Sequence, residues 1–193
     1  MTTREILLRT RSAMACLQAM DEAGKNAMLL AMADRLQEHR TDILRENAAD
    51  MEAARGHLSE GMLDRLLLNN DRIDAMAAGI RALTALPDHT GRTLSEVIRP
   101  NGMVIRKVQI PLGLIAIIYE SRPNVTSDAA ALALKSGNVC VLRSGKESIR
   151  SAAAIVTALK EGIAAMGADP EMLNLVRDTT RASAVELMQA TGL

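Results

Sequence analysis

Aromatic residues are almost missing from this chain of 193 residues, which has no Phe, no Trp and a single tyrosine, Tyr119. Single-stranded nucleic acids are bound largely by stacking bases on aromatic side chains, so no base-stacking surface is expected. Excess charge is missing too, because 23 Lys and Arg residues balance 23 Asp and Glu residues. Without net positive charge the chain lacks the bulk attraction that nucleic-acid binding uses. We therefore predict no nucleic-acid partner.

Cysteine and histidine are scarce and scattered. Cys16 and Cys140 stand among apolar neighbours, a setting that favours small core side chains over metal ligands or nucleophiles. His39, His57 and His89 fall in polar helix ends or loops, and we expect them on the solvated surface. The sequence therefore predicts no metal site.

Long apolar runs are absent as well. A membrane-spanning helix needs roughly 20 apolar residues, and no run in this sequence approaches that length. Arg4, Glu5 and Arg9 interrupt the beginning of the chain, which argues against a signal peptide. We expect a soluble cytoplasmic protein with no membrane partner.

Apolar residues recur at helical spacing through residues 3–86. The clearest stripes are Met28, Leu29, Met32 and Leu36, then Ile73, Met76, Ala77, Ile80 and Leu83, which Pro87 ends. We predict an amino-terminal helical layer over residues 1–92. An array of helices that binds a partner is the alternative, although a layer packed on its own core is favoured.

The periodicity changes in residues 93–193. Val97 and Ile98 precede a Pro-Asn-Gly turn at 100–102 and an alternating stretch to Ile110, which predicts a β-hairpin. Strands then alternate with helices, which is typical of a parallel sheet with right-handed crossovers. The predicted order is strand 113–119, helix 127–135, strand 139–142, helix 149–166, strand 172–176 and helix 181–190. We expect an incomplete Rossmann-like α/β sheet with an unpaired edge and an uncovered face.

Polar residues gather where two of these strands end. Tyr119 to Asn124 form a polar elbow after the first strand, and Arg143-Ser144-Gly145-Lys146 follow the second. In open parallel sheets, ligands bind at the carboxyl ends of the strands. The sequence therefore predicts a binding site that includes both segments.

The same block resembles the γ-glutamyl phosphate reductase branch of the aldehyde dehydrogenase superfamily. The matching segments are IPLG at 110–113, IYESRPNVT at 118–126, DAAALALKSGN at 128–138 and RSGKE at 143–147. The resemblance implies an aldehyde-dehydrogenase-like fold. It also implies that an intact enzyme reduces L-glutamyl 5-phosphate with NADPH to glutamate 5-semialdehyde, NADP⁺ and phosphate, in proline biosynthesis.

Three residues of the elbow receive roles from this resemblance. Asn124 would donate to the oxyanion that forms when a nucleophile attacks the acyl or aldehyde carbon; the alternative is a turn or helix cap. Arg122 would grip a substrate phosphate or carboxylate, with Glu120 beside it. An internal pair of Glu120 and Arg122 that only shapes the loop is an equally weighted alternative.

The second segment matches the place where the superfamily holds the adenosine ribose. Many NAD-using members carry Lys and, three residues later, Glu, whereas this sequence has Arg143 and Lys146. Cations attract a 2′-phosphate that a carboxylate would repel, so Arg143, Ser144, Gly145 and Lys146 are predicted to bind NADPH. The alternative is two solvated basic residues, an unusual pair at the start of a helix.

The family reaction also needs a nucleophilic cysteine that forms a thioester. In the family it lies further along the chain, and neither Cys16 nor Cys140 stands in a matching motif. We therefore expect this chain to be an amino-terminal fragment of the enzyme, inactive alone, from a homo-oligomer. The alternative is a non-catalytic protein that binds NADPH or pairs with a full-length subunit.

Overall fold

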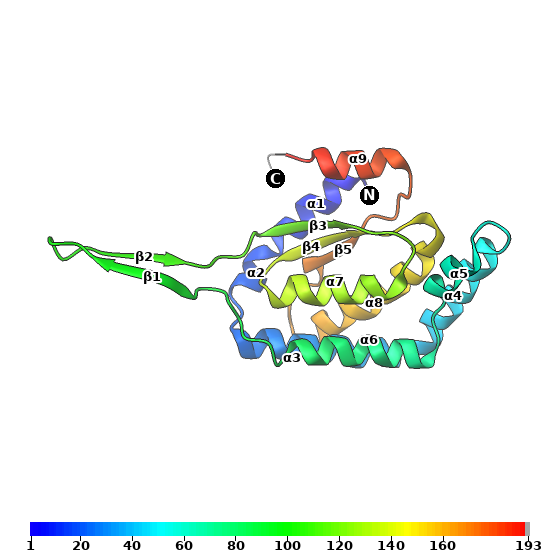
Figure 1. The fold of residues 1–193 in the computed structure, drawn as a ribbon, viewed down its shortest axis with the longest axis horizontal. Coiled ribbons are helices and arrows are strands. Elements are labelled where there is room, and N and C mark those ends of the chain that lie inside the picture. Colours follow the sequence, from blue (N-terminus) through cyan, green and yellow to red (C-terminus); the bar gives the residue numbers. More distant parts are fainter. Residues whose placement is uncertain (192–193) are drawn as a thin grey trace.

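The computed structural model describes residues 1–191, in which helices precede a hairpin and a small parallel sheet (Figure 1). The helices are α1 (Thr3–Ser12), α2 (Met14–Gln18), α3 (Glu22–Glu38), α4 (Arg40–Ala54), α5 (Glu60–Leu66), α6 (Asn70–Leu83), α7 (Pro123–Lys135), α8 (Ile149–Ala165) and α9 (Arg181–Gln189). The strands are β1 (Thr93–Ile98), β2 (Val104–Val108), β3 (Leu114–Ile118), β4 (Val139–Arg143) and β5 (Leu173–Leu175). Within these residues, no helix has both the length and the apolar character needed to cross a membrane.

The predicted helical layer is present, and its core lies between α3, α6, α7 and α8. Met28, Leu29, Met32 and Leu36 of α3 are fully buried, because their spacing puts them on one face of the helix. Asp21 caps α3 by accepting a hydrogen bond from the Gly24 amide at 2.8 Å. One buried cluster joins these helices to β4. The division of the chain at residue 92 stays a prediction.

The sheet has the order β3-β4-β5. All three strands are parallel, as expected from the alternating pattern. β4 is the central strand, and Val139, Cys140, Val141 and Leu142 are all fully buried. β3 is less buried than β4. β3 is an outer strand of the sheet formed by residues 1–191, so several of its side chains remain accessible.

Helices cover both faces of the sheet (Figure 1). α7 and α8 lie against one face, whereas α1 contacts β4 and β5 on the other and α9 contacts β3. The prediction of an uncovered face is therefore wrong. Ile6 and Leu7 of α1 pack with Val141 and Val176. This packing is favourable because it buries apolar surface on the second face of the sheet.

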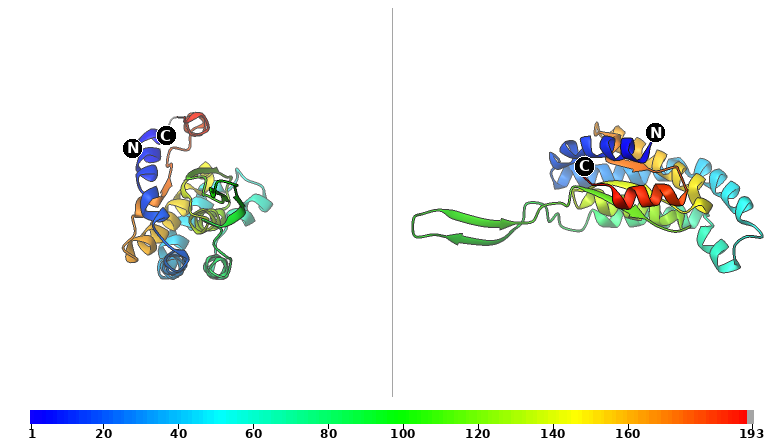
Figure 2. Two further views of the ribbon diagram at one scale, coloured as in Figure 1. Left: turned by 90° about the vertical axis from the view of Figure 1, so that its left-hand side faces the viewer. Right: turned by 90° about the horizontal axis from the view of Figure 1, so that it is seen from above.

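The predicted hairpin forms and projects from the body of the molecule as a two-stranded arm (Figure 2). Every residue of β1 and β2 is exposed. Apolar side chains are prominent among them: Leu94, Val97, Ile98, Val104, Ile105 and Val108. An exposed apolar surface of this kind is typical of an interaction site.

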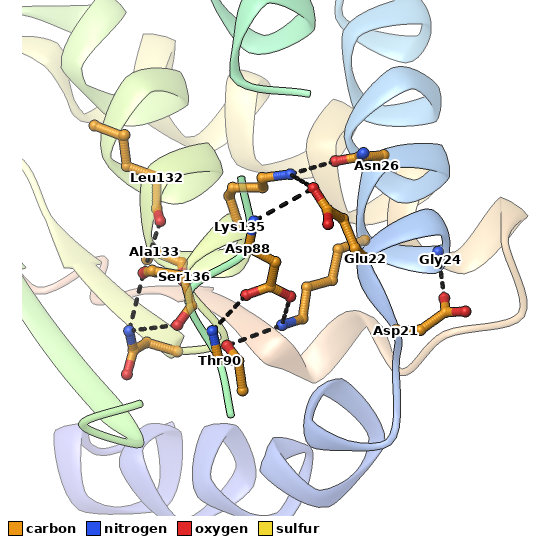
Figure 3. Close-up of polar contacts among 12 residues, drawn as sticks. Asp21, Glu22, Gly24, Asn26, Asp88, Thr90, Leu132, Ala133, Lys135 and Ser136 are labelled. Atoms are coloured by element: carbon orange, nitrogen blue, oxygen red, sulfur yellow. Dashed lines mark hydrogen bonds and ion pairs between the residues drawn. The ribbon is translucent and has the colours of Figure 1, made fainter. Parts of the chain in front are cut away.

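Buried cations hold the base of this arm against the helices (Figure 3). The Lys25 ammonium on α3 lies 2.7 Å from an Asp88 carboxylate oxygen and also donates to the Thr90 hydroxyl at 3.2 Å. Lys135, at the end of α7, donates to the Asn26 side chain at 2.6 Å. A buried ammonium is costly unless it is paired or hydrogen-bonded. The Lys25 contacts therefore fix the segment that leads into β1, and the Lys135 contact joins α7 to α3.

Candidate functional site

The polar elbow after β3 is shorter than predicted, because α7 begins at Pro123 instead of at residue 127. Proline suits the first position of a helix, since its fixed φ is already helical and no backbone N–H is needed there. Asn124 therefore lies in the first turn of α7. The Tyr119 hydroxyl, 2.6 Å from the Thr126 hydroxyl oxygen, ties the end of β3 to this turn. Burial raises the pKa of Tyr119 to about 12, so its hydroxyl stays neutral.

The two polar segments meet at the carboxyl ends of β3 and β4, as expected. The Ser121 hydroxyl donates to a Glu147 carboxylate oxygen at 2.8 Å. A Cβ on Gly145 would lie 2.9 Å from the Ser121 hydroxyl oxygen, so a larger residue there would displace the Ser121 side chain. The contact joins the loop after β4 to the elbow.

A cavity of about 400 Å³ opens beside this contact, and we call it the strand-end cavity. It is lined by Met62, Arg65, Ile118, Tyr119, Glu120, Ser121, Arg122, Arg143, Gly145 and Glu147. Four of the predicted site residues, Glu120, Arg122, Arg143 and Gly145, therefore share one cavity. Sequence reasoning missed Glu147, although it directly follows the predicted segment, and Arg65, for which the sequence offers no signal.

The residues of the predicted cofactor segment differ in their surroundings. Arg143 donates from Nη2 to the carbonyl oxygens of Thr179 and Thr180, both at 2.9 Å, and so fixes the loop before α9. Ser144 is fully buried. The Arg143 Nε and the Ser144 hydroxyl are buried without a hydrogen-bond partner among the described residues. Lys146 is exposed and does not line the strand-end cavity.

Asn124 faces a second cavity on the other side of Arg122. This helical cavity, of about 420 Å³, is lined by Asp64, Arg65, Leu67, Leu68, Arg72, Ala75, Met76, Arg122, Asn124 and Asp128. The Asn124 amide donates to Asp128 at 3.3 Å, a long hydrogen bond that leaves the amide able to turn toward a ligand. Partial shielding of the Asp128 carboxyl from water raises its pKa, although the hydrogen bond from Asn124 opposes this.

The cysteines lie outside both cavities, as their apolar neighbours predicted. Cys140 is fully buried in β4, and burial raises the pKa of its thiol to about 12. A thiol, unlike a thiolate, is a poor nucleophile. Cys16, half-buried in α2, packs against the main core. Neither residue has the setting of a reactive cysteine.

The histidines are only partly as expected. His57 and His89 are exposed, whereas His39 is half-buried and its Nε2 lies 2.7 Å from a Glu161 carboxylate oxygen on α8. This contact arises because α8 packs beside the junction of α3 and α4. Among residues 1–191 no group of three or more His, Cys, Asp or Glu side chains could hold a metal ion.

Similar sequences span the whole chain. A γ-glutamyl phosphate reductase of Streptococcus suis is 54% identical over 193 residues, which are 100% of this chain and 47% of that relative. A γ-glutamyl phosphate reductase of Neisseria meningitidis is 52% identical over 188 residues, 97% of this chain and 45% of that relative. The chain thus spans about half the length of the curated relatives it matches.

Solved structures agree with this resemblance. The crystal structure of γ-glutamyl phosphate reductase from Thermotoga maritima superposes with a TM-score of 0.95 and 35% identity, covering 97% of this chain and 46% of that one. A probable aldehyde dehydrogenase from Listeria monocytogenes shares the fold, with a TM-score of 0.73 at 14% identity over 98% of this chain and 39% of that one. The model of the aldehyde dehydrogenase family matches residues 3–193. This chain belongs to the aldehyde dehydrogenase family.

Proposed function

We propose that the full-length protein carrying this chain is a γ-glutamyl phosphate reductase, which reduces L-glutamyl 5-phosphate to L-glutamate 5-semialdehyde and phosphate in proline biosynthesis. The observation that carries the proposal is the 54% identity over all 193 residues to a relative of that name. Arg122 and Asn124, which line one cavity after β3, support it, because a guanidinium suits an anionic substrate and an amide N–H suits a developing oxyanion.

Membership of the aldehyde dehydrogenase family implies a nicotinamide cofactor for the full-length protein, and we propose that it is NADPH. The cofactor supplies the hydride when bound. The strand-end cavity fits a cofactor segment, because it lies at the carboxyl ends of parallel strands and Gly145 admits close approach of the backbone. Arg143, Ser144, Gly145 and Lys146 are the residues we propose for this role. Lys146 lies outside the lining of this cavity, whereas Glu147 belongs to it, so the Lys146 ammonium would have to reach the ligand against a neighbouring carboxylate.

The reaction is most conveniently measured in reverse, as phosphate-dependent reduction of NADP⁺ by glutamate 5-semialdehyde. We expect the full-length protein to catalyse it, and a variant with Cys16→Ala and Cys140→Ala to keep most of the activity, because Cys140 is a buried neutral thiol. This chain produced alone should show no turnover. Turnover by the chain alone, or loss of activity in a folded double variant, would contradict the proposed mechanism.

Cofactor choice is tested by Lys146→Glu in the full-length protein. Loss of a cation and gain of a repulsive charge should lower kcat/KM for NADPH relative to NADH by about 10- to 100-fold, judged from hydrogen bonds to charged groups. The effect should shrink as ionic strength rises, since an exposed contact is screened. Arg4→Glu, at an exposed position on α1, makes a similar change of charge and serves as the control. An unchanged ratio for Lys146→Glu would remove Lys146 from the site.

We also propose that the full-length protein is a homo-oligomer in the cytoplasm. The exposed apolar side chains of the hairpin arm support self-association. The same arm favours the second candidate function, a protein that binds NADPH or pairs with another subunit without catalysis, which the turnover assay distinguishes. Sedimentation of the full-length protein as a monomer would contradict the oligomer, and its recovery with membranes after cell fractionation would contradict the location.

A further inference from the structure

Arg65 of α5 and Arg122 of the elbow both line the strand-end cavity and the helical cavity. They are the two residues common to both linings, so the cavities adjoin at this pair of arginines. α5 is far from the elbow in the sequence. The folding of the helical layer against α7 brings Arg65 to the site.

Both side chains are available for a ligand. Within residues 1–191 neither Arg65 nor Arg122 forms an ion pair. By contrast, Arg72, which lines the same helical cavity, is paired through Nη2 with Asp64 at 2.8 Å. Two exposed guanidinium groups without carboxylate partners at the junction of two cavities form a surface for an anion, which arginine binds through parallel hydrogen bonds.

The groups around this pair indicate which anion. Asp128 lies in the helical cavity with Arg65 and Arg122, so cations and a carboxylate are offered side by side. A free phosphate would be repelled by that carboxylate. An α-amino acid instead carries a carboxylate and an ammonium on one carbon, and both charges would find an opposite partner. The cavity therefore fits the amino-acid end of a substrate better than a phosphate.

We propose that Arg65, together with Arg122, binds the α-carboxylate of the amino-acid substrate, with the α-ammonium directed toward Asp128. This assignment rests on the proposed function and adds to it the residue that selects an amino-acid substrate. Arg65 is exposed on α5, so its replacement leaves the core of the helical layer unchanged.

The test compares Arg65→Gln with the wild-type full-length protein on two aldehydes. Glutamate 5-semialdehyde has the α-carboxylate, and 4-aminobutanal is the same molecule without it. We expect Arg65→Gln to lower kcat/KM for glutamate 5-semialdehyde about 10- to 100-fold, the range for hydrogen bonds to a charged group, mainly through KM. The value for 4-aminobutanal and the KM for phosphate should be unchanged. Arg65→Lys should be intermediate, and Arg4→Gln on α1 should match the wild type.

Each alternative has its own outcome. Equal losses on both aldehydes, or a raised KM for phosphate, would show that Arg65 contacts the phosphate or acts on the fold, and would overturn the assignment. No loss on either aldehyde would remove Arg65 from the site. If the wild type shows no turnover, the proposed function fails. The carboxylate site is then tested separately, by calorimetric measurement of L-glutamate binding to the wild type and to Arg65→Gln. Binding that Arg65→Gln weakens at least about tenfold supports the carboxylate site, and equal or absent binding overturns it.

Discussion

Replacing Asn124 with alanine in the full-length protein is expected to lower kcat about 10²- to 10³-fold with little change in the KM for the aldehyde. An amide that stabilises the developing oxyanion acts on the transition state and contributes little to ground-state binding. Asn124 suits this role because it is exposed in the first turn of α7 and holds only a long hydrogen bond to Asp128. The measurement is steady-state kinetics in the NADP⁺ reduction assay.

Asn138→Ala is the matched control in the same βαβ unit. The Asn138 side chain is buried and accepts a hydrogen bond from the Gly113 amide at 2.8 Å. Its removal should cost about 1–3 kcal/mol of unfolding free energy and leave kcat close to that of the wild type. The two asparagines thus separate a structural role from a catalytic one. If Asn124→Ala instead lowers the melting temperature and keeps kcat, Asn124 is a residue of the helix start only.

Gly162→Ala is expected to destabilise the full-length protein by about 3 kcal/mol, the upper part of the usual range for overpacked cores. Gly162 lies where α8 crosses α3, and a Cβ there would be 2.5 Å from the Met32 Cα and 2.7 Å from the Met32 nitrogen. These are backbone atoms, so the clash is relieved only if the two helices separate. That movement would open the core around Met32 and Leu159. Thermal or denaturant unfolding measures the loss.

Gly79→Ala provides the contrast for Gly162→Ala. Gly79 is also inside a helix, α6, but the nearest atom to its added Cβ is an Asp128 carboxylate oxygen at 4.0 Å. Alanine should therefore stabilise the protein by about 0.5–1 kcal/mol through helix propensity alone. A similar change in melting temperature for both variants would show that the close packing of α3 and α8 is not what requires Gly162.

The part of the candidate site that could be predicted lies in two continuous segments. Glu120, Arg122, Arg143 and Gly145 follow consecutive parallel strands, so their convergence in one cavity follows from the topology alone. Arg65 and Asp128 could not be found in this way. Arg65 reaches the site only through the packing of the helical layer, and Asp128 looks in the sequence like an ordinary polar residue of α7.

Local sequence features were enough to predict α3, α6, the hairpin and the parallel direction of β3, β4 and β5. Each of these depends on apolar periodicity, turn residues or chain connectivity. Only the tertiary structure decided which surfaces those elements cover. α1 returns to the second face of the sheet, β3 remains half-exposed at its edge, and Arg65 comes to lie beside Arg122. Burial and proximity depend on contacts between segments distant in the sequence, and no local pattern records those contacts.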